Sequence, residues 1–415
     1  MMGIFTLASR NIRRNKRRTA LTFAAITVGI TAFMLSSTII SGIDETSLRN
    51  YLRSETAHAK IMDTNYFAER TDKPLTNLIY RYESIVSRAS AGDSPRIRAC
   101  ARLKFAASVI RESDELFCSV TGIDPARDGS VFNILPTAEH GALNAQNALA
   151  SNANRCLIGK KLAAALSVVP GDEITVNART RYSANNADTF TVADVFFSDN
   201  PEYDSFGIVI SLPDAMRLAD TENGVSEIAA ALPSRDDSIR ALLERIRPVL
   251  PSSAEVYGWR TQLADVLLFF TIRKVMQRVI LVLLLLVAVA GVTNTMLMAV
   301  FERTKEIGTL AAMGMKQIDI VRLFIAEGML IGIVGSTIAI VITFIPVMLM
   351  SVVGIPVFGT DVLANVPVSS RLYGHIEWWY YPGAIVIGTA VSVAATLYPS
   401  MKAASLNIAA VLRGK

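Results

Sequence analysis

Four stretches of the 415-residue chain contain no charged residue, and they lie at residues 19–43, 279–301, 328–360 and 378–401. A helix needs about 20 apolar residues to cross a bilayer, and a helix in a soluble core seldom runs that far without a charge. The pattern therefore predicts an α-helical membrane protein with four transmembrane helices. The long segment between the first two helices is then a separate domain outside the bilayer.

Basic residues cluster on one side of these helices. They are Arg10, Arg13, Arg14, Lys16, Arg17 and Arg18 before the first helix, Arg303, Lys305, Lys316 and Arg322 after the second, and Lys402, Arg413 and Lys415 after the fourth. The loop between the third and fourth helices has only Arg371. The positive-inside rule therefore places both termini and residues 302–327 in the cytoplasm. The aromatic residues Trp378, Trp379, Tyr380 and Tyr381 suit the outer membrane interface.

These signals predict the following organisation. It comprises a cytoplasmic amphipathic or basic helix (1–18), a first transmembrane helix (19–43), an extracytoplasmic domain with helical stalks (44–278), a second transmembrane helix (279–301), a cytoplasmic loop (302–327), a third transmembrane helix (328–355), an extracytoplasmic loop (356–377), a fourth transmembrane helix (378–401) and a cytoplasmic tail (402–415).

The extracytoplasmic segment has the composition of a folded mixed α/β domain. Residues 41–272 hold 24 Lys and Arg against 30 Asp and Glu, and the rest of the chain holds 17 against 6. The basic excess therefore belongs to the membrane-facing cytoplasmic surface and does not indicate nucleic-acid binding. The low-complexity stretch 141–155 reads as a surface loop. Cys100, Cys118 and Cys156 allow either one disulfide or buried thiols.

No catalytic set is recognisable in the sequence. It contains no G-x-x-x-x-G-K-[ST], H-E-x-x-H or G-x-S-x-G motif, and its three histidines are far apart. We therefore expect a non-catalytic subunit that binds no metal or cofactor itself.

The segment 302–317, "ERTKEIGTLAAMGMKQ", lies between the second and third apolar stretches. As a helix it would place Ile307, Leu310, Ala311 and Gly314 on one face, with charged residues at its start. A short amphipathic helix at this position could dock into a groove of a soluble partner. The alternative is an interfacial loop that only connects two helices. Beyond it, Gly328 and Gly332 form a small-xxx-small pair that would permit close helix packing.

Three segments resemble the FtsX/MacB-like ABC permease superfamily. They are "ERTKEIGTLAAMGMKQIDIVRLFIAEGMLIGIVG", "ASRNIRRNKRRTALTFAAITVGI" near the N-terminus and "LYPSMKAASLNIAAVLRG" near the C-terminus. The outer segments "VTGIDPA" and "CLIGKKLAAALSVVPGDEITV" are similar to the periplasmic core domain of the MacB and lipoprotein-releasing LolC/LolE branches.

The resemblance implies a multi-pass protein of the bacterial inner membrane with a periplasmic domain. Such permeases pair with a second permease copy or a paralogue and bind a dimer of cytoplasmic ABC ATPases, which use ATP and Mg²⁺. The short helix after the second span is then the coupling helix. By this resemblance the coupling residues are Glu302, Arg303, Lys305, Glu306, Ile307, Gly308, Leu310, Met313 and Gly314.

MacB itself carries a fused ATPase domain, and 18 residues before the first span leave no room for one, so the lipoprotein-releasing branch is favoured. The expected function is release of lipoproteins, with a periplasmic carrier as a further partner and membrane lipid around the spans. The alternatives are a MacB-like exporter of peptides or drugs and a mechanotransmitting regulator of an extracytoplasmic enzyme. The candidate cargo cavity is formed by Met34, Leu35, Ile39, Leu267, Leu268, Phe269 and Phe270.

Overall fold

A computed structural model describes residues 2–14, 16–92, 96–112, 114–132, 139, 141–151, 154–198, 200–233, 238–356, 371–375 and 377–405. The chain divides into two compact units. The first, here the helical unit, takes its described residues from 2–44, 269–356 and 371–405. The second, the sheet unit, takes them from 45–268. Most of the expected loop 356–377 and of the tail 402–415 lies outside the described residues.

The helical unit is built from long apolar helices. Its helices are α1 (Met2–Arg14), α2 (Lys16–Tyr51), α12 (Ala264–Glu302), α13 (Thr304–Ala312), α14 (Gln317–Val352) and α15 (Tyr380–Ala404), and a short pair of strands comprises β10 (Ile355–Pro356) and β11 (Arg371–Leu372). Among the described residues, four helices are long and apolar enough to cross a membrane, namely α2 with its continuation to Thr56, α12, α14 and α15. The predicted set of four membrane helices is confirmed.

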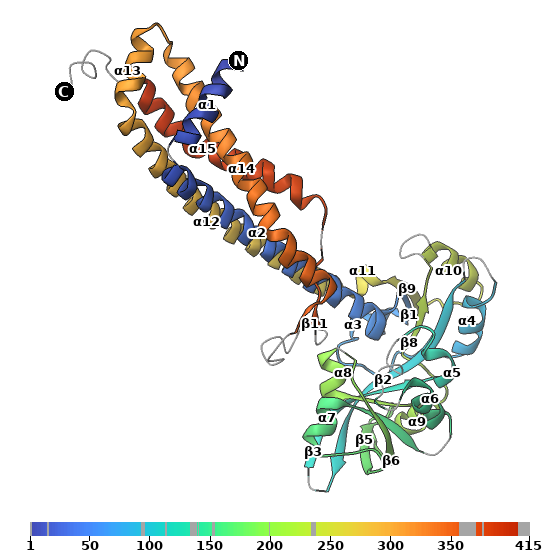
Figure 1. Ribbon diagram of the computed structural model, residues 1–415. Coiled ribbons are helices and arrows are strands. Elements are labelled where there is room, and N and C mark those ends of the chain that lie inside the picture. The colour runs from blue at the N-terminus through green and yellow to red at the C-terminus, as the bar shows by residue number, and fades with distance from the viewer. Residues whose placement is uncertain are drawn as a thin grey trace. The chain divides into compact units, whose positions relative to one another are not determined.

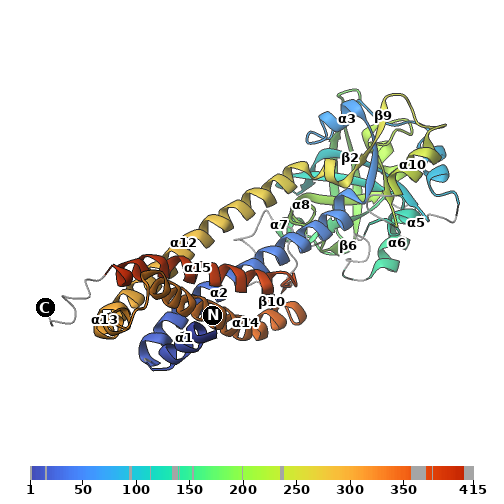
Figure 2. The same cartoon turned by 90° about the horizontal axis from the view of Figure 1, so that it is seen from above.

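The four long helices pack around one apolar core. Ile26 and Met34 of α2, Val292 of α12, Ile331 of α14 and Ala384 of α15 are all buried in it. Figure 1 shows α2 and α12 side by side, and Figure 2 views the same helices from above. The Thr22 hydroxyl donates to the Thr295 hydroxyl at 3.0 Å across this helix pair.

Small residues bring α14 and α15 into close contact. A Cβ atom on Gly332 would lie 2.6 Å from the Cα of Thr389 and 2.9 Å from the carbonyl oxygen of Gly388. A Cβ on Gly328 would lie 2.6 Å from the side chain of Thr396. Only glycine fits at these distances, so the small-xxx-small pair packs one helix against the next, as expected in lipid.

The sheet unit contains nine strands and several short helices. Its strands are β1 (Ala59–Asp63), β2 (Arg98–Arg111), β3 (Asp114–Ile123), β4 (Arg155–Gly159), β5 (Glu173–Arg179), β6 (Asn185–Phe196), β7 (Gly207–Ser211), β8 (Glu227–Ala231) and β9 (Ala254–Gly258). Its helices are α3 (Thr64–Ala68), α4 (Tyr82–Ala89), α5 (Pro125–Asp128), α6 (Ala142–Ala150), α7 (Lys160–Ala165), α8 (Pro201–Phe206), α9 (Leu212–Ala219), α10 (Ser238–Ile246), α11 (Trp259–Gln262) and the π-helix η1 (Leu52–Thr56).

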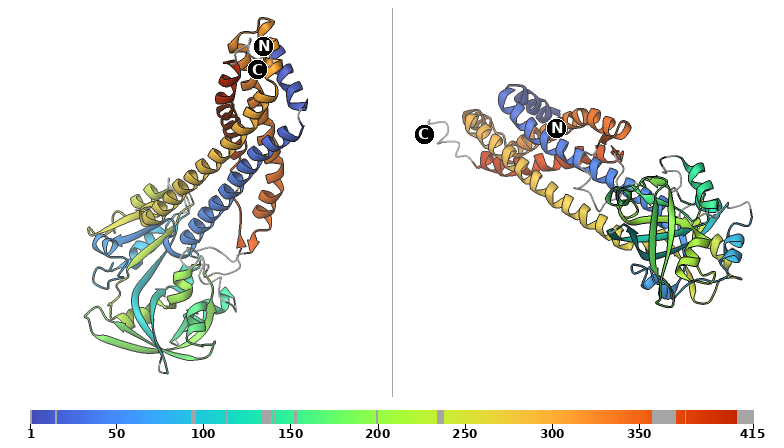
Figure 3. Two further views of the ribbon diagram at one scale, coloured as in Figure 1. Left: turned by 90° about the vertical axis from the view of Figure 1, so that its left-hand side faces the viewer. Right: turned by 90° about the horizontal axis from the view of Figure 1, so that it is seen from below.

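The strands form a mixed sheet in the order β3-β7-β4-β6-β5-β2-β8-β1-β9, and β3 also pairs with β2. Six strands therefore close into a ring, and β8, β1 and β9 extend from it. The long strand β2 joins the two parts, because Arg98–Arg102 pair with β8 and Ala107–Ile110 pair with β5. The curved strands are visible in Figure 3. The predicted large mixed α/β domain is confirmed.

Two expectations about the sheet unit are settled by its packing. The stretch 141–155 was predicted to be a loop, but it forms α6, whose Ala145 and Leu149 lie four residues apart and are buried against Leu157 and Val209. The polar residues around this apolar pair hid the helix from sequence reasoning.

The three cysteines are free and buried, so the buried-thiol alternative is correct for Cys100, Cys118 and Cys156.

Candidate functional site

The connection between α12 and α14 is a short helix held at both ends. At its start, the Thr304 hydroxyl lies 3.0 Å from the carbonyl oxygen of Val300 and 2.8 Å from that of Phe301. At its end, the Gly314 amide donates to Ala311 and the Met315 amide donates to Leu310. These two bonds, with a φ of +98° at Gly314, form a Schellman motif, which needs glycine at this position. The helix α13 therefore has a fixed length and two fixed ends.

Arg303, at the junction of α12 and α13, points inward. Its side chain is only 5% exposed, and its guanidinium lies 3.2 Å from the carboxylate of Glu327 on α14, which is 3% exposed. The Nε atom of Arg303 lies 3.5 Å from Glu306. A buried ion pair is costly to break because either charge alone would remain desolvated. The pair therefore ties α13 to the start of the third membrane helix.

The N-terminal helix α1 packs over this junction. Ala8 is fully buried against Leu323 and Ala326 of α14. The Asn11 amide donates to the Glu327 carboxylate at 2.5 Å, and Arg14 pairs with Glu306. A crevice of about 70 Å³ lies between α1, α13 and α14. The amphipathic N-terminal helix therefore binds the α13 junction as well as flanking the first membrane helix.

The predicted coupling residues divide into an inner and an outer set. Arg303, Ile307 and Gly308 are buried, and Leu310 is half-buried. The exposed residues are Glu302, Lys305, Glu306, Met313 and Gly314. The prediction that Gly314 lies on the apolar face of the helix is wrong. The helix α13 ends at Ala312, and Gly314 forms the turn after it. The outer surface of α13, with Lys305, Thr309 and Met313, is available to a partner.

A second cluster of buried charges lies in the sheet unit, where the chain leaves α2. The carbonyl oxygen of Ser54 in η1 accepts from Arg102 at 3.3 Å. Arg102 is fully buried and makes two hydrogen bonds, of 2.7 and 2.9 Å, to Asp128. Its guanidinium also lies 3.3 Å from the ring centroid of Phe132. The last turn of the first stalk is therefore bound to the sheet by a paired arginine.

Four further charges join the same helix to strands β1, β2 and β8. Lys104 lies 2.6 Å from Glu55 of η1 and 3.4 Å from Glu227, and Lys60 lies 2.7 Å from Glu227. Burial raises the pKa of the Glu227 carboxyl, but Lys104 and Lys60 outweigh burial and hold that pKa below its usual value. Burial lowers the pKa of Lys104, but Glu227 and Glu55 bring it well above its usual value. Lys60, Lys104 and Glu227 therefore form one ionic network, which lies beside a cavity of about 250 Å³.

The two helical stalks meet within the sheet unit. Leu52 at the end of the first stalk packs with Trp259 and Leu263, and Leu48 and Leu267 lie against the same cluster. Movement of either stalk end would therefore act on the other stalk and on the sheet. Within the described residues, no group of three or more His, Cys, Asp or Glu side chains could hold a metal ion.

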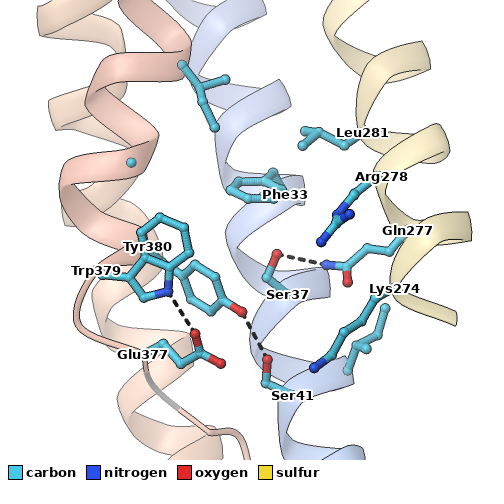
Figure 4. A pocket seen from close by; sticks show the side chains of 13 residues that line it. Phe33, Ser37, Ser41, Lys274, Gln277, Arg278, Leu281, Glu377, Trp379 and Tyr380 are labelled. Carbon is cyan, nitrogen blue, oxygen red and sulfur yellow. Dashed lines mark hydrogen bonds between the residues drawn. The ribbon is translucent and has the colours of Figure 1, made fainter. Parts of the chain in front are cut away.

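The candidate cargo residues differ in burial and come from both units. Met34 is buried in the bundle core and Phe270 is 8% exposed, whereas Leu268 and Phe269 are exposed. Leu35 and Ile39 are half-buried in the helical unit, and Leu267 belongs to the sheet unit. A cavity of about 370 Å³ does lie between α2, α12 and α15, but other residues line it (Figure 4). Cargo binding by the seven residues stays a prediction.

Sequence reasoning missed the partners of the predicted residues. Glu327 is a lone carboxylate beside a long apolar stretch, and an ionisable residue in that setting signals a functional or structural role. That signal was available. Nothing in the sequence pairs Glu327 with Asn11, 316 residues away, or Arg102 with Asp128.

Comparison with known proteins identifies the family. The model of the MacB-like periplasmic core domain matches residues 19–249, more than half of the chain, and that of the FtsX-like permease C-terminal region matches residues 278–408. The periplasmic region of MacB from Actinobacillus actinomycetemcomitans superposes with a TM-score of 0.38 at 15% identity, covering 53% of this chain and 97% of that one.

Three relatives show how far the similarity extends. The lipoprotein-releasing system transmembrane protein LolC of Xylella fastidiosa is 22% identical over 432 residues, 97% of each chain. The pyoverdine export ATP-binding/permease protein PvdT of Pseudomonas fluorescens is 24% identical over 78% of this chain and 48% of its own length. An uncharacterized ABC transporter permease of Methanocaldococcus jannaschii is 30% identical over 32% of this chain and 30% of its own length. The chain is therefore a membrane protein of the ABC transporter permease family, with a MacB-like periplasmic core domain and an FtsX-like permease region.

Proposed function

We propose that this chain is the permease subunit of a lipoprotein-releasing transporter in a bacterial inner membrane. A separate cytoplasmic ATPase would supply ATP hydrolysis, and the chain itself would be non-catalytic. The sheet unit would lie in the periplasm, with both termini in the cytoplasm. The distribution of basic residues supports this orientation.

One observation carries the choice of lipoprotein release. The similarity to LolC runs through 97% of both chains, so it includes the long apolar stretches, the outer domain and the connecting helix of this chain. The similarity to PvdT, whose name includes an ATP-binding function, covers less than half of that protein. The 415 residues contain no P-loop motif, which supports a separate ATPase subunit.

The geometry of α13 supports the coupling role. A partner that presses on the exposed Lys305 and Met313 would act on a helix with fixed ends and a buried Arg303–Glu327 link to α14. Because α1 also contacts Glu327 and Glu306, displacement of α13 would involve three helices together. At the other end, the charges around η1 would carry stalk movement into the sheet. Work would then be done on cargo at the periplasmic side.

The first test is purification of the complex from native membranes in mild detergent, followed by mass spectrometry and reconstitution. We expect an ABC ATPase and lipoproteins to copurify, and we expect ATP to release an acylated lipoprotein from proteoliposomes to a soluble carrier. An intact complex without an ATPase would overturn the coupling mechanism. An ATPase with an adaptor or outer-membrane channel, and without lipoprotein, would overturn lipoprotein release.

The coupling surface is tested by a double variant that adds negative charge to it, with a charge reversal elsewhere as the control. Lys305→Glu combined with Met313→Glu should reduce ATPase stimulation at least tenfold, because both side chains are exposed on or beside α13. Arg179→Glu, an exposed reversal in the sheet unit, should leave stimulation unchanged. Equal stimulation in both proteins would mean that α13 is only a connector.

The second candidate is an exporter of the PvdT type. The 24% identity over 78% of this chain supports it. In that case the transported molecule would stimulate ATP hydrolysis without being acylated, and lipoprotein would not be released in the reconstituted assay.

A further inference from the structure

A mixed polar and apolar cavity lies within the helical unit, between α2, α12 and α15. Its volume is about 370 Å³, and it is only partly enclosed. It is separate from the α13 junction and from the charged cluster in the sheet unit, and neither predicted site includes it. Figure 4 shows side chains from all three helices pointing into it.

The residues of α12 that line the cavity follow one helical face. Lys274, Gln277, Arg278 and Leu281 lie at i, i+3, i+4 and i+7. The two cations at one end and the leucine at the other make this face amphipathic along its length. The Gln277 amide donates to the Ser37 hydroxyl of α2 at 2.8 Å, which keeps the two helices in register beside the cavity.

The lining residues of α2 and α15 also change from polar at one end of the cavity to apolar at the other. At the cationic end, the Ser41 hydroxyl of α2 lies 3.1 Å from the Tyr380 hydroxyl of α15. The Trp379 indole donates to Glu377 at 2.8 Å. At the opposite end, Phe33 and Ile387 are apolar lining residues. Tryptophan and tyrosine concentrate where a membrane helix passes the lipid headgroups, so the polar end lies at headgroup level.

The cations at the polar end retain capacity for an anion. Lys274 lies 3.9 Å from Asp44, which Arg273 also pairs with. Arg278 makes no ion pair among the residues that the structure describes, and its side chain points toward α2 in Figure 4. An arginine and a lysine one turn apart can both donate to one phosphate group.

We propose that this cavity binds a glycerophospholipid from the membrane leaflet at the Tyr380 end of α15. The phosphodiester lies between Lys274 and Arg278, and the start of an acyl chain lies along Phe33, Leu281 and Ile387. Basic pockets between transmembrane helices are known to hold lipid headgroups, which agrees with this assignment. The proposal requires only that the helices span a membrane and does not depend on the cargo.

The phosphate distinguishes this ligand from an acylated protein. A diacylglyceryl lipopeptide has acyl chains but no phosphodiester, so its lipid part offers the two cations no anionic group. A free phosphate ion would use the cations but not the apolar end. The phospholipid is the ligand that uses both ends of the cavity.

Native mass spectrometry of the full-length protein in detergent tests the proposal, with phosphatidylglycerol and phosphatidylethanolamine added as probes. We expect the wild type to bind one phospholipid at least tenfold more tightly than the double variant Lys274→Gln/Arg278→Gln. The matched control Arg322→Gln/Lys402→Gln also loses two exposed positive charges, outside the cavity, and should bind like the wild type. Equal binding by the wild type and the cavity variant would overturn the site.

A second variant tests the apolar end without removing charge. A Cβ on Gly383 would meet no atom within 4 Å, so Gly383→Leu should fill the cavity and leave the fold intact. We expect it to weaken phospholipid binding at least fivefold, while 20 mM inorganic phosphate alone leaves wild-type lipid occupancy unchanged. Displacement of lipid by inorganic phosphate would make the site a simple anion site. Binding of a synthetic diacylglyceryl lipopeptide that is lost in the Lys274/Arg278 variant would assign the cavity to cargo instead.

Discussion

The helical unit and the sheet unit are held together by different kinds of contact. In the helical unit, glycines on α14 and α15 let backbones approach closely, and the buried ion pair Arg303–Glu327 links the end of α12 to α14. In the sheet unit, a large apolar core is combined with a network of buried charges around Lys104 and with the paired Arg102.

The difference follows from the solvent around each unit. In lipid the tails are as apolar as the side chains, so helices associate by close packing and by a few polar contacts. In water the apolar core supplies the driving force, and buried charges cost free energy unless they are paired. The charges of the sheet unit therefore help to hold η1 on the sheet, together with the packing of Leu52 against Trp259 and Leu263.

The largest effect should come from Asp128→Asn in the sheet unit. The change leaves Arg102 fully buried with reduced charge compensation, so we expect a loss of about 3–5 kcal/mol in the free energy of unfolding. The measurement is hydrogen exchange of β2 and η1 in the detergent-solubilised full-length protein. The control Asp124→Asn changes a more exposed carboxylate that caps α5 and should cost less than about 1 kcal/mol. Equal protection in the two variants would contradict an anchoring role for Arg102.

A smaller effect is expected from Glu327→Gln at the α13 junction. It removes the negative charge that Arg303 and Asn11 contact. We expect the free energy of unfolding to fall by about 1.5–3 kcal/mol. Thermal stability in detergent and ATPase stimulation in the assembled complex would both be measured, with exposed Glu173→Gln in the sheet unit as the control. We expect stimulation to fall several-fold in the first variant only. If ATPase stimulation stayed normal while stability fell, the Arg303–Glu327 ion pair would stabilise the bundle but play no part in coupling.

Packing of α14 on α15 should be sensitive to one added side chain. Gly332→Val places a Cβ 2.6 Å from Thr389, so we expect overpacking to cost about 1–3 kcal/mol. Gly383→Ala, on the same helix pair but in open space, should have no such cost. The thermal midpoint of the detergent-solubilised protein distinguishes them. An unchanged thermal midpoint in the Gly332→Val protein would contradict the idea that α14 and α15 pack through glycine at this position.

The smallest effect is a pH dependence confined to the sheet unit. Because the pKa of Glu227 is lowered in the folded protein, its contribution to stability is present above the unfolded pKa of about 4.5 and is lost as pH falls through the folded value. Hydrogen exchange of β8 between pH 6 and pH 3, corrected for intrinsic rates, should show this loss in the wild type. The Glu227→Gln protein should lose less stability over that range, whereas exposed Glu244→Gln should follow the wild type.

The candidate sites were predictable only in part. Charge and periodicity left a short helix and a connecting loop both open after the second span, and Ile307 lies on the buried face of α13 as the pattern indicated. Arg303 looked like a surface charge in the sequence, because its neighbours Glu302 and Lys305 are charged and exposed. Its burial depends on Glu327 and on α1, which no local pattern relates to it. The helix α6 was missed because asparagine and glutamine residues separate Ala145 and Leu149, which are buried in the fold.

The sequence by itself determined the four membrane helices and the mixed α/β domain, because apolar length and local periodicity act within a few turns of chain. Only the tertiary structure decided which charges are buried together and which helices enclose a cavity. Those contacts join residues from distant parts of the chain, as with Lys60 and Glu227 or Ser37 and Gln277. Their energies depend on burial and distance, and both exist only once the helices and strands have packed.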